Sequence, residues 1–220
     1  MTRLPQYRSR LTFAQVAEGM TRALENAARL AEDAQSLFNQ NRIPSSVALA
    51  ILSIEESGKV SILRQMVTAE DEKQHQQLWK AYRSHNKKNI LWLFGELVQQ
   101  GARSLEEFRL LVDPDSDHPD ILDQLKQLCT YTDCFTDGKW SSPIEVDVLT
   151  LAPYLVKLAQ ILGRPRTVTS EEVELWRKHL LPVEHAPMPL QKQAVMNWYN
   201  EMKLRGLSDA SLEEVERFLA

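Results

Sequence analysis

The sequence lacks several features that would point directly to a class of protein. Its 220 residues include only two cysteines, Cys129 and Cys134, too few for a disulfide framework or a four-cysteine zinc site. The first ten residues are polar and contain no apolar stretch of the signal-peptide type. The longest apolar run, 47–54, is too short to span a bilayer. We therefore expect a cytoplasmic protein with no membrane segment.

An excess of positive charge is also lacking. The chain has 26 lysines and arginines against 30 acidic residues, which gives a net charge of −4. That balance argues against broad, non-specific binding of nucleic acid, although it leaves room for a small basic cleft that acts on RNA. Gly-rich phosphate loops, GxSxG elbows and HExxH motifs are missing. We expect no cofactor and no metal, and a metal-dependent hydrolase is disfavoured.

Helical periodicity is the strongest pattern in the chain. Apolar residues recur at steps of three and four between residues 13 and 38, which predicts a long amphipathic helix. Pro44 suits the first turn of a second helix, apolar around much of its circumference and ending near residue 67. Further helices are expected within 69–100 with a break near 83–86, and at 104–112, 121–129, 143–162 with a kink at Pro153, 170–180, 188–205 and 208–219.

Strict alternation of apolar and polar residues nowhere persists long enough to require a strand. The clearest loop signal is the dipeptide Asp137-Gly138. The predicted class is all-α. We expect a helical bundle over residues 12–163, with residues 164–220 forming a small helical extension packed on the same domain.

A first candidate site lies inside the apolar second helix, at Glu55, Glu56 and Lys59. Adjacent carboxylates in a buried helix are costly unless they are paired. On one interpretation, one carboxylate points to solvent and the other pairs with Lys59 at the spacing of four. On the other interpretation, one carboxylate orients or activates a catalytic group.

A second candidate site follows Trp79 and Tyr82. His85 stands there on the inward stripe of its helix, among the cations Lys80, Arg83, Lys87 and Lys88. A histidine so placed is more often a hydrogen-bonded core residue, and a run of cations is usually a solvated face. With a carboxylate nearby, however, His85 could move protons near neutral pH, and the cations could stabilise a phosphorane. A histidine, nearby cations and a carboxylate are the groups that metal-independent RNA cleavage needs.

Both candidate sites belong to a longer pattern. It contains Asn26, Ala27, Leu30, Asp33, Ala34 and Leu37 in the first helix, and Ala48, Ala50, Glu55, Glu56, Gly58 and Lys59 in the second. It continues with His85 and Lys88, and then with Tyr131, Asp133, Gly138, Trp140 and Pro143. Over roughly residues 20–160, the chain thereby resembles AbiV-type abortive-infection proteins of the HEPN superfamily.

The resemblance implies a HEPN-like helical bundle that forms a homodimer. It implies an anti-phage defence effector, a toxin that targets RNA or the translation machinery, and a phage-encoded protein as activator. Catalytic HEPN domains usually carry an arginine, then four to six residues, and then the histidine. Here Arg83 lies only two residues before His85, and Lys80 is the nearest cation at the longer spacing.

On this hypothesis, His85, Lys88, Glu55 and Glu56 form the catalytic group, and Lys80, Arg83, Lys87 and Lys59 are the RNA-binding cations. His85 is the general base or acid, a glutamate orients it, and Lys59 is an ion-pair partner. The alternative is a non-catalytic interaction protein that senses a phage protein and blocks a host or phage factor. A shared open cleft for Glu55, Glu56 and His85 would favour catalysis, whereas a closed, buried network would favour binding.

Overall fold

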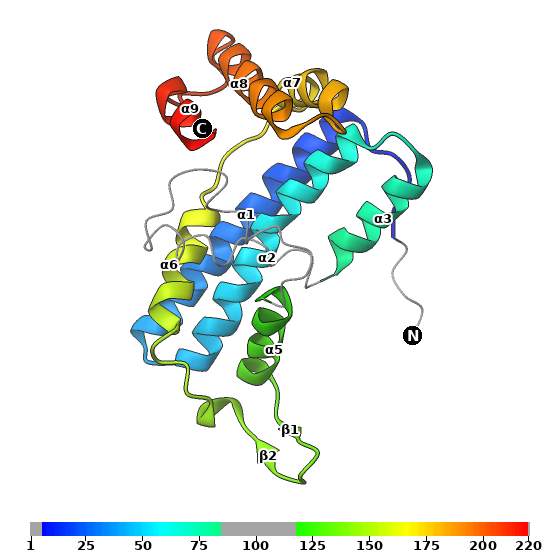
Figure 1. Ribbon diagram of the computed structural model, residues 1–220. Helices are drawn as coiled ribbons and strands as arrows, with labels where there is room; N and C mark the ends of the chain where they lie inside the picture. The colour runs from blue at the N-terminus through cyan, green and yellow to red at the C-terminus, as the bar shows by residue number, and fades with distance from the viewer. Residues whose placement is uncertain (1–5, 85–117, 220) are drawn as a thin grey trace.

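The computed structural model describes residues 6–84 and 118–219 (Figure 1). Its two longest helices, α1 (Phe13–Asn39) and α2 (Ile43–Thr68), form an antiparallel pair. A capping box starts α1, because the Thr12 side chain accepts from the Gln15 N–H and the Gln15 side chain accepts from the Thr12 N–H. Pro44 lies in the first turn of α2, as predicted.

Small side chains let α1 and α2 approach each other closely. Ala27, Ala34 and Ala50 are completely buried. The buried hydroxyls of Ser46 and Ser53 on α2 donate to the carbonyl oxygens of Ala34 and Ala27 on α1, each at 2.7 Å. These bonds satisfy polar groups that would otherwise be costly to bury. The α1–α2 pair is therefore the centre of the bundle.

Three further helices pack on this pair: α3 (Glu72–Arg83) and α5 (His118–Thr130) on α2, and α6 (Ala152–Leu162) on both. One apolar cluster joins the α1–α2 turn to α5 and α6, and a second joins the other end of the pair to α3. The all-α class is confirmed (Figure 1). The helices predicted over 86–100 and 104–112 lie outside the described residues.

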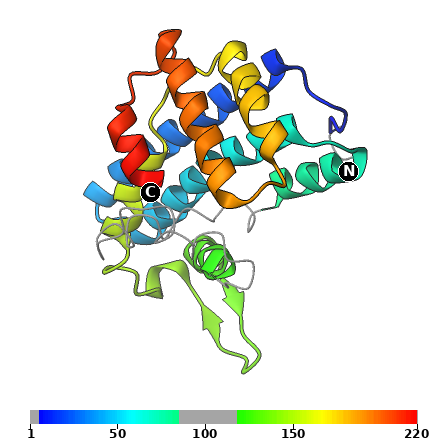
Figure 2. The same ribbon diagram turned by 45° about the horizontal axis from the view of Figure 1, so that its top comes forward.

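A short hairpin follows α5 and extends away from the bundle (Figures 1 and 2). Its strands, β1 (Asp133–Cys134) and β2 (Trp140–Ser141), are antiparallel. Gly138 lies between them with φ of 78°, a left-handed conformation that glycine adopts without steric cost. The Asp137-Gly138 signal thus marks a hairpin turn. The strands escaped prediction because two residues cannot display alternation.

The region 143–162 differs from the single kinked helix that was predicted. Pro143 begins one 3-10 turn, Pro143–Glu145, and α6 starts only at Ala152. Pro153 therefore occupies the first turn of α6, where its missing N–H leaves no helical hydrogen bond unmade. The predicted kink at Pro153 is wrong, since this proline begins the helix.

The chain ends in three helices, α7 (Ser170–Leu180), α8 (Met188–Leu204) and α9 (Leu212–Leu219), close to their predicted bounds. Thr169 caps α7 by accepting from the Glu172 N–H at 3.1 Å. α7 packs on α1 and α2, α8 packs on α7, and α9 packs on α8. They form a layer beside the end of the pair where α1 begins (Figure 2). No described helix is long and apolar enough to cross a bilayer.

Gly163 ends α6 where the chain passes close to α1. A Cβ added there would lie 2.8 Å from the Ala159 oxygen and 3.1 Å from the backbone carbon and oxygen of Ala27. Backbone atoms, rather than a flexible side chain, would have to move. We expect Gly163→Ala to lower the free energy of unfolding by about 1–3 kcal/mol in urea denaturation.

Gly19→Ala is the control for this prediction. Its added Cβ would meet only the two Leu63 methyl carbons, at 3.4 and 4.0 Å. Alanine is favoured over glycine inside a helix by about 1 kcal/mol. Gly19→Ala should therefore be neutral or stabilising. Equal losses in the two variants would contradict a specific close approach at Gly163.

Candidate functional site

The two adjacent glutamates of α2 have different partners. Glu55 is 2% exposed and accepts a hydrogen bond of 2.6 Å from the ammonium of Lys126 on α5. Lys126 is also buried, and it donates to Asp123 at 2.7 Å. These three side chains form a largely closed charged cluster between α2 and α5.

Lys126 stays charged in this cluster. Burial by itself lowers the pKa of Lys126, but hydrogen bonds to Asp123 and Glu55 outweigh burial and raise the pKa above its ordinary value. One ammonium thus faces two carboxylates within hydrogen-bonding distance. Glu55 is held by this ion pair between two helices, at a distance from open solvent.

Glu56 pairs with Lys59, with 2.5 Å between Oε1 and Nζ. Lys59 therefore pairs with the glutamate three residues before it, whereas the interpretation from sequence paired it with the glutamate four residues before it. The side chains of Glu56 and Lys59 are each only 18% exposed. Since Glu55 is buried as well, neither glutamate points freely to solvent. The Lys59 ammonium lies 5.2 Å from the centroid of the Tyr82 ring on α3. Lys59 thus connects α2 to the helix that leads into residue 85.

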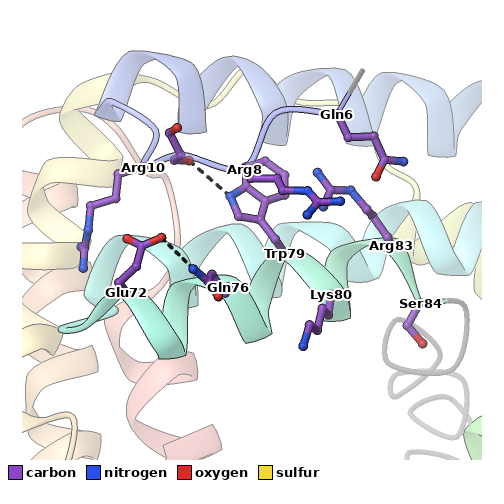
Figure 3. A pocket seen from close by; sticks show the side chains of 10 residues that line it. Gln6, Arg8, Arg10, Glu72, Gln76, Trp79, Lys80, Arg83 and Ser84 are labelled. Atoms are coloured by element: carbon purple, nitrogen blue, oxygen red, sulfur yellow. Dashed lines mark hydrogen bonds between the residues drawn. The ribbon is translucent and has the colours of Figure 1, made fainter. Parts of the chain in front are cut away.

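A pocket lies between α3 and the segment that precedes α1 (Figure 3). Its volume is about 660 Å³. Four cations line it: Lys80 and Arg83 from α3, and Arg8 and Arg10 from the preceding segment. Glu72 is the one acidic residue among the described residues that line it. Positive charge is therefore concentrated here on a protein of net charge −4; we call this site the α3 pocket.

Trp79 holds the two walls of the α3 pocket together. Its indole N–H donates to the Ser9 carbonyl at 3.2 Å, and the Tyr7 ring meets it edge-on with 6.2 Å between centroids. The Arg83 guanidinium lies over the same indole, 4.9 Å from its centroid. Arg83 also donates to the Tyr7 carbonyl at 2.5 Å, so its side chain points from the end of α3 toward the preceding segment (Figure 3).

The structure brings Lys80 and Arg83 together in the α3 pocket, and it places Glu55, Glu56 and Lys59 outside the lining. His85, Lys87 and Lys88 lie outside the described residues. Ser84 lines the pocket, and the chain continues from it directly into His85. Of the predicted cationic patch, the two described members are therefore part of a pocket, while the predicted carboxylates belong to ion pairs elsewhere on α2.

Sequence reasoning missed Lys126, Arg8 and Arg10. A signal for Lys126 was present, because it follows Leu122 by four residues and precedes Cys129 by three, which puts a charge on an apolar stripe. Arg8 and Arg10 precede the first periodic segment and carry no comparable signal. Their contribution depends on how the chain folds back along α3.

The other residues with reactive side chains are held in the core or lack partners for a metal site. Within the described ranges, no group of three or more His, Cys, Asp or Glu residues could hold a metal ion. Burial raises the pKa of the Cys129 thiol to about 11, so it is protonated at neutral pH. Burial, and then the charge of Arg10, lower the pKa of His75, which packs edge-on against Trp79.

A family model described as AbiV, HEPN_AbiV, matches residues 15–164. No curated protein and no solved structure shows a significant match to the chain. The matched region contains the Glu55–Lys126 cluster and both cations that α3 contributes to the pocket. It excludes Arg8, Arg10 and the helices α7–α9. Because the match covers more than half of the chain, and agrees with the resemblance found over residues 20–160, this protein belongs to the HEPN_AbiV family of abortive-infection proteins.

Proposed function

We propose that this protein is an abortive-infection effector that acts against phage by targeting RNA, directly or within the translation machinery. The observation that carries the proposal is the α3 pocket, whose cations Lys80 and Arg83 lie five and two residues before His85. Membership of the AbiV family supports the defence role. The effector works as a homodimer in which the His85 segments of two protomers meet, and a phage-encoded protein activates it.

Metal-independent cleavage of RNA needs three groups. A base removes the proton of the 2′-hydroxyl, a cation stabilises the phosphorane, and a donor protonates the leaving 5′-oxygen. His85 performs the proton transfer in this proposal, while Lys80, Lys87 and Lys88 hold the phosphate. Arg83, which is bound to the Tyr7 carbonyl, adds positive charge beside them. Lys80 has the spacing of the usual HEPN arginine and keeps its charge, but it lacks the planar fork of a guanidinium.

The glutamates act through other residues in this proposal. Glu56 holds Lys59, which contacts Tyr82 and so positions α3. Glu55 holds Lys126 and so fixes α5 against α2. Glu56 is therefore a positioning residue for α3, the helix that leads to His85, and Glu55 is a positioning residue for α5.

A second function is favoured by one observation, the burial of Glu55 in its ion pair with Lys126. A catalytic carboxylate has to come within hydrogen-bonding reach of the group on which it acts. A buried, charge-paired Glu55 suits a protein whose polar residues fix the geometry of the bundle. Such a protein would sense a phage protein and block a host or phage factor by binding.

Purified wild-type protein and His85→Ala, each incubated with total cellular RNA and with tRNA, distinguish the two functions. The reactions are run with and without EDTA and with and without phage lysate, and products are separated on a sequencing gel. We expect discrete cleavage by the wild type that persists in EDTA and is absent from His85→Ala. His185→Ala, at an exposed histidine of the C-terminal region, should cleave like the wild type. No cleavage by a protein that still protects cells would establish the binding function.

A further inference from the structure

We propose that the segment 6–10 supplies one wall of a binding site for single-stranded RNA, with Arg8 as its phosphate contact across the α3 pocket from Lys80. The inference rests on the proposed function, because it assigns the ligand of the same pocket. It adds a part that the family match does not contain, since that match begins at residue 15.

The backbone around Arg8 is fixed at both sides. The Arg10 guanidinium donates to the carbonyl oxygens of Ala69 and Glu70, just past the end of α2, at 2.9 and 3.0 Å. The Tyr7 hydroxyl donates to the Arg10 carbonyl at 3.1 Å. Together with the bonds from Trp79 to Ser9 and from Arg83 to Tyr7, these contacts hold the segment against α3. None of them uses the Arg8 side chain.

Two of the four cations of the pocket are left for a ligand. Arg10 and Arg83 are committed to backbone carbonyls, as described above. Arg8 and Lys80 are exposed, and neither head group has a hydrogen-bonding or ion-pair partner among the described residues. The carboxylate of Glu72 accepts from Gln76, at 3.4 Å, instead of neutralising either cation. A guanidinium and an ammonium that have no partner in the described part of the chain therefore line one pocket from two separate walls.

This arrangement suits a phosphodiester of a flexible strand. Arginine offers a phosphate two parallel N–H donors, and lysine offers a compact charge. A pocket of about 660 Å³ has the size of a nucleotide site, whereas the phosphates of a duplex lie on a convex rod and cannot enter it. Gln76, Ser9 and Ser84 add hydrogen-bonding groups to the walls. Trp79 is buried and offers no stacking face, so binding depends on charge.

Fluorescence anisotropy with a labelled, single-stranded 2′-O-methyl RNA measures binding without cleavage, because the attacking hydroxyl is blocked. We expect Arg8→Gln and Lys80→Gln each to weaken binding about fivefold to tenfold. The slope of log K against log salt concentration is negative, and each variant should make it less steep by about 0.7, the value for one lost phosphate contact on a single strand. The control Arg22→Gln removes an exposed arginine of α1 outside the pocket and should change neither quantity.

The outcomes separate the two proposals. If Lys80→Gln binds weakly while Arg8→Gln binds like the wild type with the same slope, the role of the N-terminal segment is overturned and the RNA function stands. If the wild type does not bind RNA at all, the RNA function is overturned as well. If free 5′-AMP competes as well as the oligonucleotide at equal phosphate concentration, the pocket is a mononucleotide site and the assignment to RNA is wrong.

Discussion

Lys126→Met is expected to lower the free energy of unfolding by about 3–5 kcal/mol, because it removes the cation and leaves Glu55 charged and buried. Methionine keeps most of the length and apolar surface of lysine, so lost packing contributes little. Urea denaturation followed by far-UV circular dichroism measures the change.

Two further variants show whether the loss comes from the charge. The double variant Glu55→Gln/Lys126→Met removes the two most buried charges of the cluster and leaves only the more exposed Asp123. It should recover much of the lost stability, since replacing a buried pair is often close to neutral. Lys139→Met removes an exposed lysine of the hairpin and should stay within about 0.5 kcal/mol of the wild type. A loss at Lys126 no larger than that at Lys139 would contradict the ion-pair account.

The double variant also bears on function. It keeps the bundle folded while it removes the carboxylate of Glu55. Retained defence against phage in cells that carry this variant would limit Glu55 to a positioning role. Lost defence from a protein of nearly wild-type stability would instead require the Glu55 carboxylate for activity, which its buried position in the ion pair does not by itself explain.

The sequence allowed α1 and α2 to be predicted almost to the residue, because α1 repeats the helical period over many turns and Pro44 marks the start of the long apolar segment that forms α2. Pro153 could not be assigned in the same way. Proline is compatible with the first turn of a helix and with a kink inside one, and the apolar residues before it continue a helix-like pattern. The choice depends on packing: α6 begins where Ala152 and Leu155 enter the core, and periodicity alone does not contain that information.

The same distinction between local and distant contacts applies to the candidate site. Lys80 and Arg83 are neighbours on one helix, so a positive patch was predictable from their spacing. The partner of Glu55 is 71 residues away in the sequence, and no helical spacing could identify it. Arg8 reaches the α3 pocket because Trp79 and Arg83 bind the segment that precedes α1, and because Arg10 attaches this segment to the backbone past the end of α2.

Glu172 of α7 is the second position where a large effect is expected, because it joins the C-terminal helices to the bundle. This carboxylate is buried. Arg166 donates to both of its oxygens at 2.8 Å, and Arg64 of α2 donates at 3.4 Å. The Arg64 guanidinium also lies over the rings of Trp176 and Trp198, 5.0 and 5.2 Å from their centroids. Burial lowers the pKa of Arg64, and the charge of Glu172 opposes that effect.

Glu172→Gln is expected to lower the free energy of unfolding by about 2–4 kcal/mol, because Arg64 and Arg166 then face each other without a counter-charge. The side chains of Arg64 and Arg166 are 27% and 44% exposed, and the resulting solvent screening keeps the effect below that of Lys126→Met. Tryptophan fluorescence reports part of the change, since Trp176 and Trp198, two of the five tryptophans, flank Arg64. Glu174→Gln, at an exposed glutamate of the same helix, is the matched control.

The order of the unfolding signals then shows what this cluster does. If Glu172 joins α7–α9 to the bundle, the part of the tryptophan signal of Glu172→Gln that comes from Trp176 and Trp198 should change at lower urea than the far-UV circular dichroism, which reports mainly the longer helices α1 and α2. Coincident transitions at lower urea would mean that the bundle and these helices unfold as one unit. A variant that unfolds like Glu174→Gln would show that apolar packing alone holds the C-terminal helices in place, and that Arg64 is a surface contact.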